Sequence, residues 1–146
     1  MAYWDTSCLA KLYAPETDSA DLKARVIGGT SIITSEIARL EIWTTLCRKE
    51  AVGDLIAGGA RRGLQAFDQD VATGMIGVET LHTAVVEKFE NIVERCYSQV
   101  PALALRTLDA IHLASAMVAG ESEMITTDKR LRDAALQFGF QTYPRQ

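Results

Sequence analysis

The sequence has no apolar run long enough to span a bilayer, and no basic segment followed by an apolar stretch near its start. We therefore expect neither a membrane segment nor a secretion signal, and we predict a cytoplasmic protein. Repeats, low-complexity tracts and recognisable linkers are also missing. With 146 residues, 48% of them hydrophobic, the chain can bury one core, so we expect a single domain over residues 1–146.

Cysteine is scarce. Cys8, Cys47 and Cys96 are widely spaced, odd in number and without a CxxC pair, which favours reduced thiols over a disulfide framework or a zinc site. The formal net charge is −4, which argues against a large basic surface that grips nucleic acid. A net charge of −4 is still compatible with a nucleic-acid-binding protein whose acidic residues are concentrated in a metal site.

Short apolar or β-branched segments alternate with stretches of helical spacing. Strands are expected at residues 1–4, 31–34, 75–78 and 124–126, with a short edge strand at 142–143. Helices are expected at 7–13, 17–27, 36–52, 55–71, 83–97, 108–118 and 129–138, with Ser35 and Thr107 as N-caps. Gly58, Gly59 and Gly63 weaken the helix at 55–71, which we expect to be mobile or held by a partner. The alternation predicts a parallel α/β sheet, whose ligands bind beyond the carboxyl ends of the strands.

Acidic side chains follow or flank several of these elements. Asp5 comes directly after the first strand, where a lone charge in a parallel sheet is unfavourable. Glu41 lies among apolar neighbours inside the long helix after the second strand. Asp109 falls in the first turn of its helix, where the dipole favours an anion, and Asp128 follows the fourth strand. Each Asp has an alternative interpretation as a simple cap, and Glu41 as a solvated residue, but together they predict four converging carboxylates.

Converging carboxylates repel one another, so without a cation at least one would have a strongly raised pKa. Oxygen ligands of this kind fit Mg²⁺ or Mn²⁺. With substrate present, two ions about 4 Å apart could activate water and stabilise the leaving oxygen of a phosphodiester. Ser7 and Thr126, two residues after Asp5 and two before Asp128, are candidates to orient a carboxylate or a bound water.

Four strings, read together, resemble the PIN-domain family: D-T-S at 5–7, S-E-I-A-R-L-E at 35–41, R-T-L-D-A-I-H-L-A-S-A at 106–116 and T-T-D-K-R-L at 126–131. Over essentially its whole length the chain is similar to the VapC-type ribonuclease toxins of toxin–antitoxin pairs, and the third string is the most specific. The resemblance implies a three-layer α/β/α fold with a central parallel sheet of four to five short strands. It also implies a Mg²⁺- or Mn²⁺-dependent endoribonuclease that leaves 5′-phosphate and 3′-hydroxyl ends. Its metal and catalytic residues would be Asp5, Glu41, Asp109 and Asp128, with Ser7 and Thr126 beside them.

The same resemblance implies a small antitoxin whose C-terminal segment lies in a groove and blocks the site, often by inserting an arginine. It further implies homodimers, and heterotetramers or larger assemblies with the antitoxin. One departure from the family is the pair Tyr3–Trp4, where aliphatic residues are more usual. This pair could alter packing near the site, but it removes no acidic position.

Several other polar residues have two interpretations. Lys11, Lys129 and Arg130 are candidates to hold RNA phosphates, with a solvated charged helix face as the alternative. Glu36 competes with Glu41 in the same helix, but a solvated Glu in a first turn is ordinary. His112 could be a metal ligand, although a hydrogen-bonded, partly buried histidine is the favoured interpretation.

Two other functions stay open. In an aspartate-based phosphotransfer domain, the phosphatase type expects a second Asp two residues after the first, where this chain has Ser7. The receiver type expects an early acidic cluster and a later Lys in a turn, and neither occurs. A catalytically inactive PIN-fold binding protein would be expected to lose at least one acid, whereas all four are present.

Overall fold

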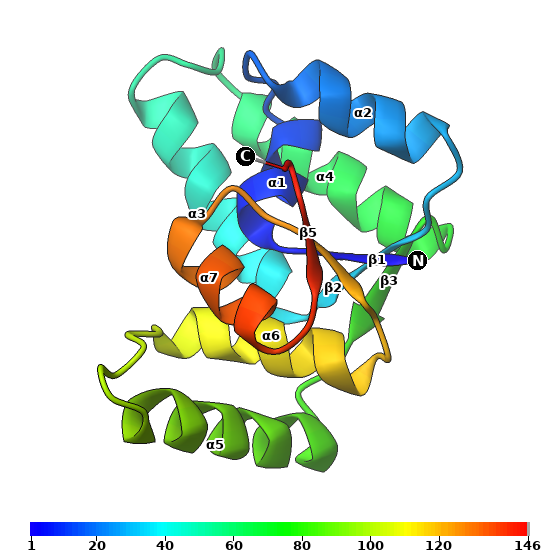
Figure 1. Cartoon of the computed structure of the whole chain (residues 1–146). Helices are drawn as coiled ribbons and strands as arrows, with labels where there is room; N and C mark the ends of the chain where they lie inside the picture. The colour runs from blue at the N-terminus through cyan, green and yellow to red at the C-terminus, as the bar shows by residue number, and fades with distance from the viewer. Residues whose placement is uncertain (146) are drawn as a thin grey trace.

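A parallel sheet lies at the centre of the computed structural model, which describes residues 1–145 (Figure 1). Within that range the sheet has five strands in the order β3-β2-β1-β4-β5, and every pair is parallel. The strands are β1 Ala2–Trp4, β2 Ile32–Ser35, β3 Ile76–Glu79, β4 Glu123–Ile125 and β5 Gln141–Tyr143. The predicted parallel sheet of four to five short strands is confirmed, with boundaries within two residues of those expected.

The helices follow the predicted order. They are α1 Thr6–Leu9, the 3₁₀-helix η1 Ala10–Leu12, α2 Ser19–Ile27, α3 Ile37–Ala51, α4 Gly59–Ala72, α5 Thr83–Ser98, α6 Thr107–Val118 and α7 Lys129–Gln137. The single helix expected at 7–13 is wrong, because the chain tightens there from an α-helical to a 3₁₀ turn. In the described part of the chain, no helix is both long and apolar enough to cross a membrane.

Two predicted N-caps are also wrong. Ser35 is the last residue of β2, since it pairs with Glu79 of β3, and the cap position falls to Glu36. The Ser35 hydroxyl nevertheless accepts a hydrogen bond from the backbone nitrogen of Ile37 at 3.3 Å. Thr107 is the first helical residue of α6, and Arg106 before it has the extended backbone of an N-cap.

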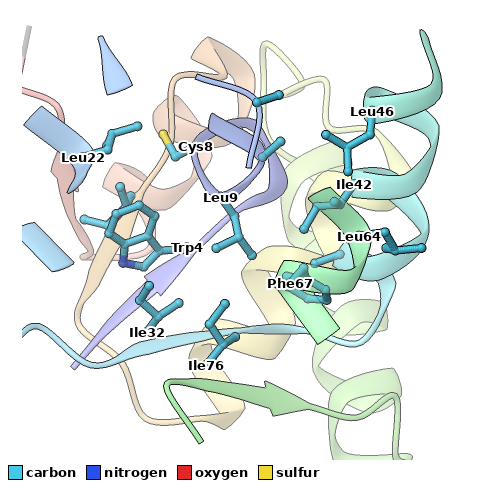
Figure 2. Close-up of a cluster of buried hydrophobic side chains, with 14 of the residues drawn as sticks. Trp4, Cys8, Leu9, Leu22, Ile32, Ile42, Leu46, Leu64, Phe67 and Ile76 are labelled. Atoms are coloured by element: carbon cyan, nitrogen blue, oxygen red, sulfur yellow. The ribbon is translucent and has the colours of Figure 1, made fainter. Parts of the chain in front are cut away.

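Alternating side chains of the strands face two hydrophobic clusters. Ala2 and Trp4 of β1 lie in a cluster with side chains of α1 to α4, and Figure 2 shows the Trp4 indole among them. Tyr3 faces the opposite way, into a cluster with side chains of α5, α6 and α7. Tyr3 and Trp4 are fully buried, and burying a large apolar side chain contributes about 1.5–3 kcal/mol. The sheet thus lies between two helical layers, which confirms the three-layer α/β/α architecture.

Two glycines have separate roles in α4, one at its start and one at its contact with α3. Gly58 is the N-cap, with a φ of +80° that favours glycine. Gly63 faces α3, and a Cβ there would lie 3.0 Å from Leu46 Cδ1 and 3.4 Å from the carbonyl oxygen of Tyr13. The helix expected to be mobile or held by a partner therefore packs closely on its own chain.

The position of β1 determines where a ligand can bind. From β1 the chain builds β2 and β3 on one side, and it returns to add β4 and β5 on the other. The carboxyl ends of β1 and β4 therefore flank the point where the strand order reverses. Open parallel sheets bind ligands in the crevice at such a point.

Candidate active site

The segments that follow β1 and β4 lie side by side, because these strands are parallel neighbours. Asp5 is the first residue after β1, and Thr126 is the first after β4. The backbone nitrogen of Asp5 donates to the carbonyl oxygen of Ile125 at 3.1 Å. The ladder between the two central strands thus extends into the site and fixes the position of Asp5.

Asp5 is buried, with 4% of its surface exposed. Its Oδ1 accepts hydrogen bonds from Ser7 Oγ at 2.6 Å and from the backbone nitrogen of Cys8 at 3.2 Å, while Oδ2 accepts from Thr126 Oγ1 at 2.8 Å. Burial raises the pKa of Asp5, and the nearby His112 with these donors offsets only part of the rise. A buried carboxyl of this kind is ready to be paired with a cation.

The hydroxyls of Ser7 and Thr126 both contact Asp5, and both extend the network. Thr126 Oγ1 accepts from the backbone nitrogen of Asp128 at 3.0 Å, which links the two acids. Ser7 Oγ accepts from the backbone nitrogen of Thr127 at 3.2 Å and from its hydroxyl at 3.1 Å. The Asp5 carboxylate is therefore held in one orientation by α1 and by the loop after β4.

Glu41 reaches the same end of the sheet from α3, where it contacts α6 and α1. Glu41 Oε1 lies 2.6 Å from His112 Nε2 and accepts from Thr6 Oγ1 at 2.9 Å. His112 Nδ1 lies 2.7 Å from Tyr3 Oη, so a ring with its proton on Nε2 accepts from the phenol and donates to Glu41. Burial raises the pKa of Glu41, but the pairing with His112 and the hydrogen bond from Thr6 outweigh burial and lower it. The favoured interpretation of His112, a hydrogen-bonded histidine, agrees with these contacts, although the ring is buried rather than partly exposed.

Asp109 and Asp128 share one cationic partner, Arg106. Arg106 Nε donates to Asp109 Oδ2 at 2.8 Å, and its Nη2 donates to Asp109 Oδ1 at 3.2 Å and to Asp128 Oδ2 at 2.6 Å. Asp128 is also the N-cap of α7, because its Oδ1 accepts from the backbone nitrogens of Arg130 and Leu131. Its interpretation as a helix cap therefore holds alongside its place at the site.

The donor atoms of this site match a hard divalent cation in kind, since the acids supply oxygen and both nitrogens of His112 are engaged in hydrogen bonds. Within residues 1–145, no three acidic, histidine or cysteine side chains are grouped closely enough to hold a metal ion. The reason is visible in the contacts: Asp109 and Asp128 face Arg106, and Glu41 faces His112. The chemistry of these donors fits such an ion, which would have to compete with Arg106 and His112 for their oxygens.

A cleft of about 560 Å³ opens beside Ser7 and Glu41. Its walls carry the cationic side chains of Lys11, Arg48 and Lys49. Lys11 is paired with Asp18 and Glu16, and Lys49 is paired with Glu16, so their charges are partly neutralised. Of the predicted phosphate-binding residues, Lys11 therefore lies on the cleft but is engaged with acids.

The other two predicted phosphate-binding residues lie at the start of α7. Lys129 is exposed and pairs with Asp133 one turn along the helix at 2.9 Å. Arg130 is exposed, and its backbone nitrogen contacts Asp128. Glu36 points away from the acids, since its Oε1 accepts from the backbone nitrogen of Leu81 at 2.6 Å.

Sequence reasoning assigned no role to Arg106, Thr6 or Arg48, although each lies at the site or on its cleft. Arg106 precedes Asp109 by three positions, and that spacing predicts an ion pair at the start of a helix. Thr6 lies inside the D-T-S string, between the two residues singled out there. Arg48 carries no local signal, because only the packing of α3 beside α1 brings it to the cleft.

Comparison with known sequences identifies the family. Residues 2–136 match the PIN domain, and the chain therefore belongs to the PIN-domain family. Two curated relatives come from Mycobacterium tuberculosis. Ribonuclease VapC45 is 28% identical over 148 residues, covering 100% of this chain and 96% of that protein. Ribonuclease VapC46 is 30% identical over 139 residues, covering 94% of this chain and 92% of that protein.

Solved structures agree on the fold. The crystal structure of Mycobacterium tuberculosis VapC20, a sarcin–ricin loop cleaving toxin, superposes with a TM-score of 0.66 at 20% identity, covering 92% of this chain and 95% of that one. VapBC2 from Rickettsia felis, bound to a DNA fragment from its promoter, gives a TM-score of 0.64 at 10% identity and covers 97% of each chain. Membership of the PIN family argues against the phosphotransfer domain considered from the sequence.

Proposed function

We propose that this protein is a metal-dependent endoribonuclease, a single nuclease domain that acts as the toxin of a type II toxin–antitoxin pair. The observation that carries the proposal is a chain of contacts at the carboxyl ends of β1 and β4. Thr126 joins Asp5 to Asp128, and Arg106 joins Asp128 to Asp109. Thr6, next to Asp5, contacts Glu41. The names of its relatives, which are VapC ribonucleases, support the same activity.

The residues that would hold Mg²⁺ or Mn²⁺ are Asp5, Glu41, Asp109 and Asp128. When bound, such a cation supplies Lewis-acid activation of water and neutralises the charge that develops on the phosphodiester. A cation would offset the cost of burying the Asp5 carboxylate, which raises the pKa of Asp5.

The neighbouring residues hold these acids in place. Ser7 and Thr126 keep both oxygens of Asp5 in fixed hydrogen bonds. His112 and Thr6 orient Glu41, and the Tyr3 phenol fixes the His112 ring from the other side. Such supporting contacts commonly set the orientation and the basicity of metal ligands.

The substrate site we propose is the cleft beside Ser7 and Glu41. A single-stranded or looped RNA would lay its phosphates along Lys11, Arg48 and Lys49, which line the walls. Lys129 and Arg130, exposed at the start of α7 next to Asp128, would contact the backbone on the other side of the acids.

The partner we propose is a small antitoxin. A second groove of about 460 Å³ is lined by Leu40 and Leu108, with Glu41 and Arg48 shared with the substrate cleft. Leu40 and Leu108 are exposed large apolar side chains directly beside an acid of the site. An antitoxin segment with apolar residues and one arginine would fill this groove and block the acids. Two solved neighbours of the same fold are a toxin–antitoxin complex and VapBC2 on promoter DNA, which supports an antitoxin partner. The homodimer, and the heterotetramer or larger assembly with antitoxin, are proposed from the family resemblance.

The test is cleavage of a mixed RNA substrate by antitoxin-free protein with Mg²⁺, Mn²⁺ or EDTA, in wild type, Asp5→Asn and Asp133→Asn. Asp133→Asn is the matched control. It removes the same unit of charge from an aspartate of α7, whose partner is Lys129 and not one of the four acids. We expect cutting with either metal, none with EDTA, a loss of at least about 100-fold in Asp5→Asn and no loss in Asp133→Asn.

The outcomes separate the alternatives. If folded wild type cuts no RNA with either metal and calorimetry detects no divalent binding, the nuclease proposal is wrong and the chain is a binding protein with a PIN fold. Activity that survives in Asp5→Asn would place the catalytic site elsewhere. For the partner, Leu40→Asp should abolish complex formation with the product of a neighbouring small reading frame while leaving RNA cleavage intact.

A further inference from the structure

The guanidinium of Arg106 bridges two of the four acids. Nε and Nη2 contact both oxygens of Asp109, and Nη2 continues to Asp128 Oδ2 at 2.6 Å. Asp109 lies in the first turn of α6, whereas Asp128 caps α7, so one side chain joins two separate elements. The planar guanidinium suits such paired contacts with carboxylates.

These contacts use the carboxylate oxygens that a cation would need. Both oxygens of Asp109 accept from Arg106, and Oδ1 of Asp128 is occupied as the cap of α7. The remaining oxygen of Asp128, Oδ2, also accepts from Arg106. A divalent ion between Asp109 and Asp128 therefore has to take oxygens that the guanidinium now holds.

The guanidinium lies on the outside of the pair it bridges. The Arg106 side chain is 57% exposed, whereas the side chains of Asp109 and Asp128 are 8% and 27% exposed. It can therefore swing into solvent without disturbing the core. Because the guanidinium is itself exposed and regains water when it leaves, a divalent ion with twice its charge can displace it.

We propose that Arg106 occupies the place of the divalent cation in the resting protein, and that metal binding displaces it. Arg106 is thus a positioning residue that holds Asp109 and Asp128 together and weakens their affinity for metal. This inference rests on the proposed function, since it concerns the same metal site.

The test is calorimetric titration of Mn²⁺ into the antitoxin-free full chain, as wild type, Arg106→Gln and Arg130→Gln. Arg130→Gln removes the same unit charge at the same end of the sheet, and within residues 1–145 the Arg130 side chain makes no hydrogen bond to Asp109 or Asp128. We expect Arg106→Gln to bind Mn²⁺ about tenfold more tightly than wild type, and Arg130→Gln to stay within about twofold. Arg106→Lys, which keeps the charge but not the paired contacts, should lie between wild type and Arg106→Gln.

A second readout follows the displaced side chain itself. In wild type, titration with diamagnetic Mg²⁺ should shift the Arg106 Nε–H resonance toward that of a solvated guanidinium, at the same concentrations at which the metal binds. Thermal unfolding of each variant checks that the exposed substitution leaves the fold intact.

Three results would overturn the inference. If wild type binds Mn²⁺ and Arg106→Gln binds no more tightly, Arg106 does not compete with metal, and the nuclease proposal is untouched. An equal gain in Arg130→Gln would mean that net charge, not the bridge, controls affinity. No binding by any variant would overturn both this inference and the metal-dependent nuclease.

Discussion

The Tyr3 phenol and the His112 imidazole lie 2.7 Å apart, from Oη to Nδ1, although 109 positions separate them in the sequence. Their rings meet edge to face at a centroid distance of 5.8 Å. Tyr3 belongs to the central strand and His112 to α6, and the other ring nitrogen contacts Glu41 of α3. The unusual aromatic before Asp5 is therefore tied to the acidic site by a hydrogen bond as well as by packing.

Tyr3→Phe should destabilise the protein by about 1–3 kcal/mol, because it leaves a nitrogen of the buried His112 without its partner. The RNA cleavage rate should fall less than in Asp5→Asn, since Glu41 keeps its contacts with His112 and Thr6. Urea unfolding and single-turnover cleavage measure the two effects. Tyr143→Phe, in an edge strand outside this network, is the control. An equal loss of stability in both variants would mean that the hydrogen bond from Tyr3 to His112 contributes nothing specific.

The free energy of unfolding of Asp5→Asn, relative to that of wild type, should be higher at about pH 7 than at about pH 4. Burial raises the pKa of Asp5 above its value in the unfolded chain. The stability that protonated Asp5 contributes is therefore present below the unfolded pKa and is lost as the pH rises through the folded pKa. Asn does not titrate, so it escapes this loss. Metal-free urea unfolding at both pH values measures the difference. If the stability of Asp5→Asn relative to wild type instead falls as the pH rises, the raised pKa of Asp5 is contradicted.

Thiol reactivity should be confined to Cys47 in the folded protein. Cys8 is fully buried, and burial with the nearby Asp5 raises its pKa to about 12. Cys96 is also fully buried, and burial raises its pKa, whereas Cys47 is partly exposed. Ellman's reagent should titrate one thiol rapidly at neutral pH and all three in denaturant. Rapid labelling of Cys8, found by peptide mapping, would show that the segment next to Asp5 opens.

Gly63→Ala should lower the free energy of unfolding by about 1–2 kcal/mol. The new Cβ would lie 3.0 Å from Leu46 Cδ1, and Leu46 is fully buried between α3 and α4. This clash exceeds the gain of up to about 1 kcal/mol from the better helix propensity of alanine. Gly77→Ala in β3 is the control, since its Cβ would come no closer than 3.6 Å to its neighbours. A stabilised Gly63→Ala would mean that α3 and α4 separate easily.

Local patterns were enough to predict much of the fold. Alternation of short apolar segments with helical spacing predicted every strand and the parallel sheet, because side-chain period is a local property of the chain. Boundaries failed where tertiary pairing decides them, as at Ser35, which pairs with Glu79 and so extends β2 by one residue. The glycines of α4 suggested a weak helix, because the surface around Leu46 on which α4 packs cannot be recognised from the local sequence.

The sequence by itself determined which acids stand after the central strands, and therefore that Asp5 and Asp128 would share one end of a parallel sheet. It also placed Ser7 two positions after Asp5 and Thr126 two positions before Asp128, and both hydroxyls contact Asp5. Only the tertiary structure decided the partners of these acids: His112 for Glu41, and Arg106 for Asp109 and Asp128. The physical reason is that charge partners are chosen by distance in space, and packing of α3, α6 and α7 around the sheet sets those distances.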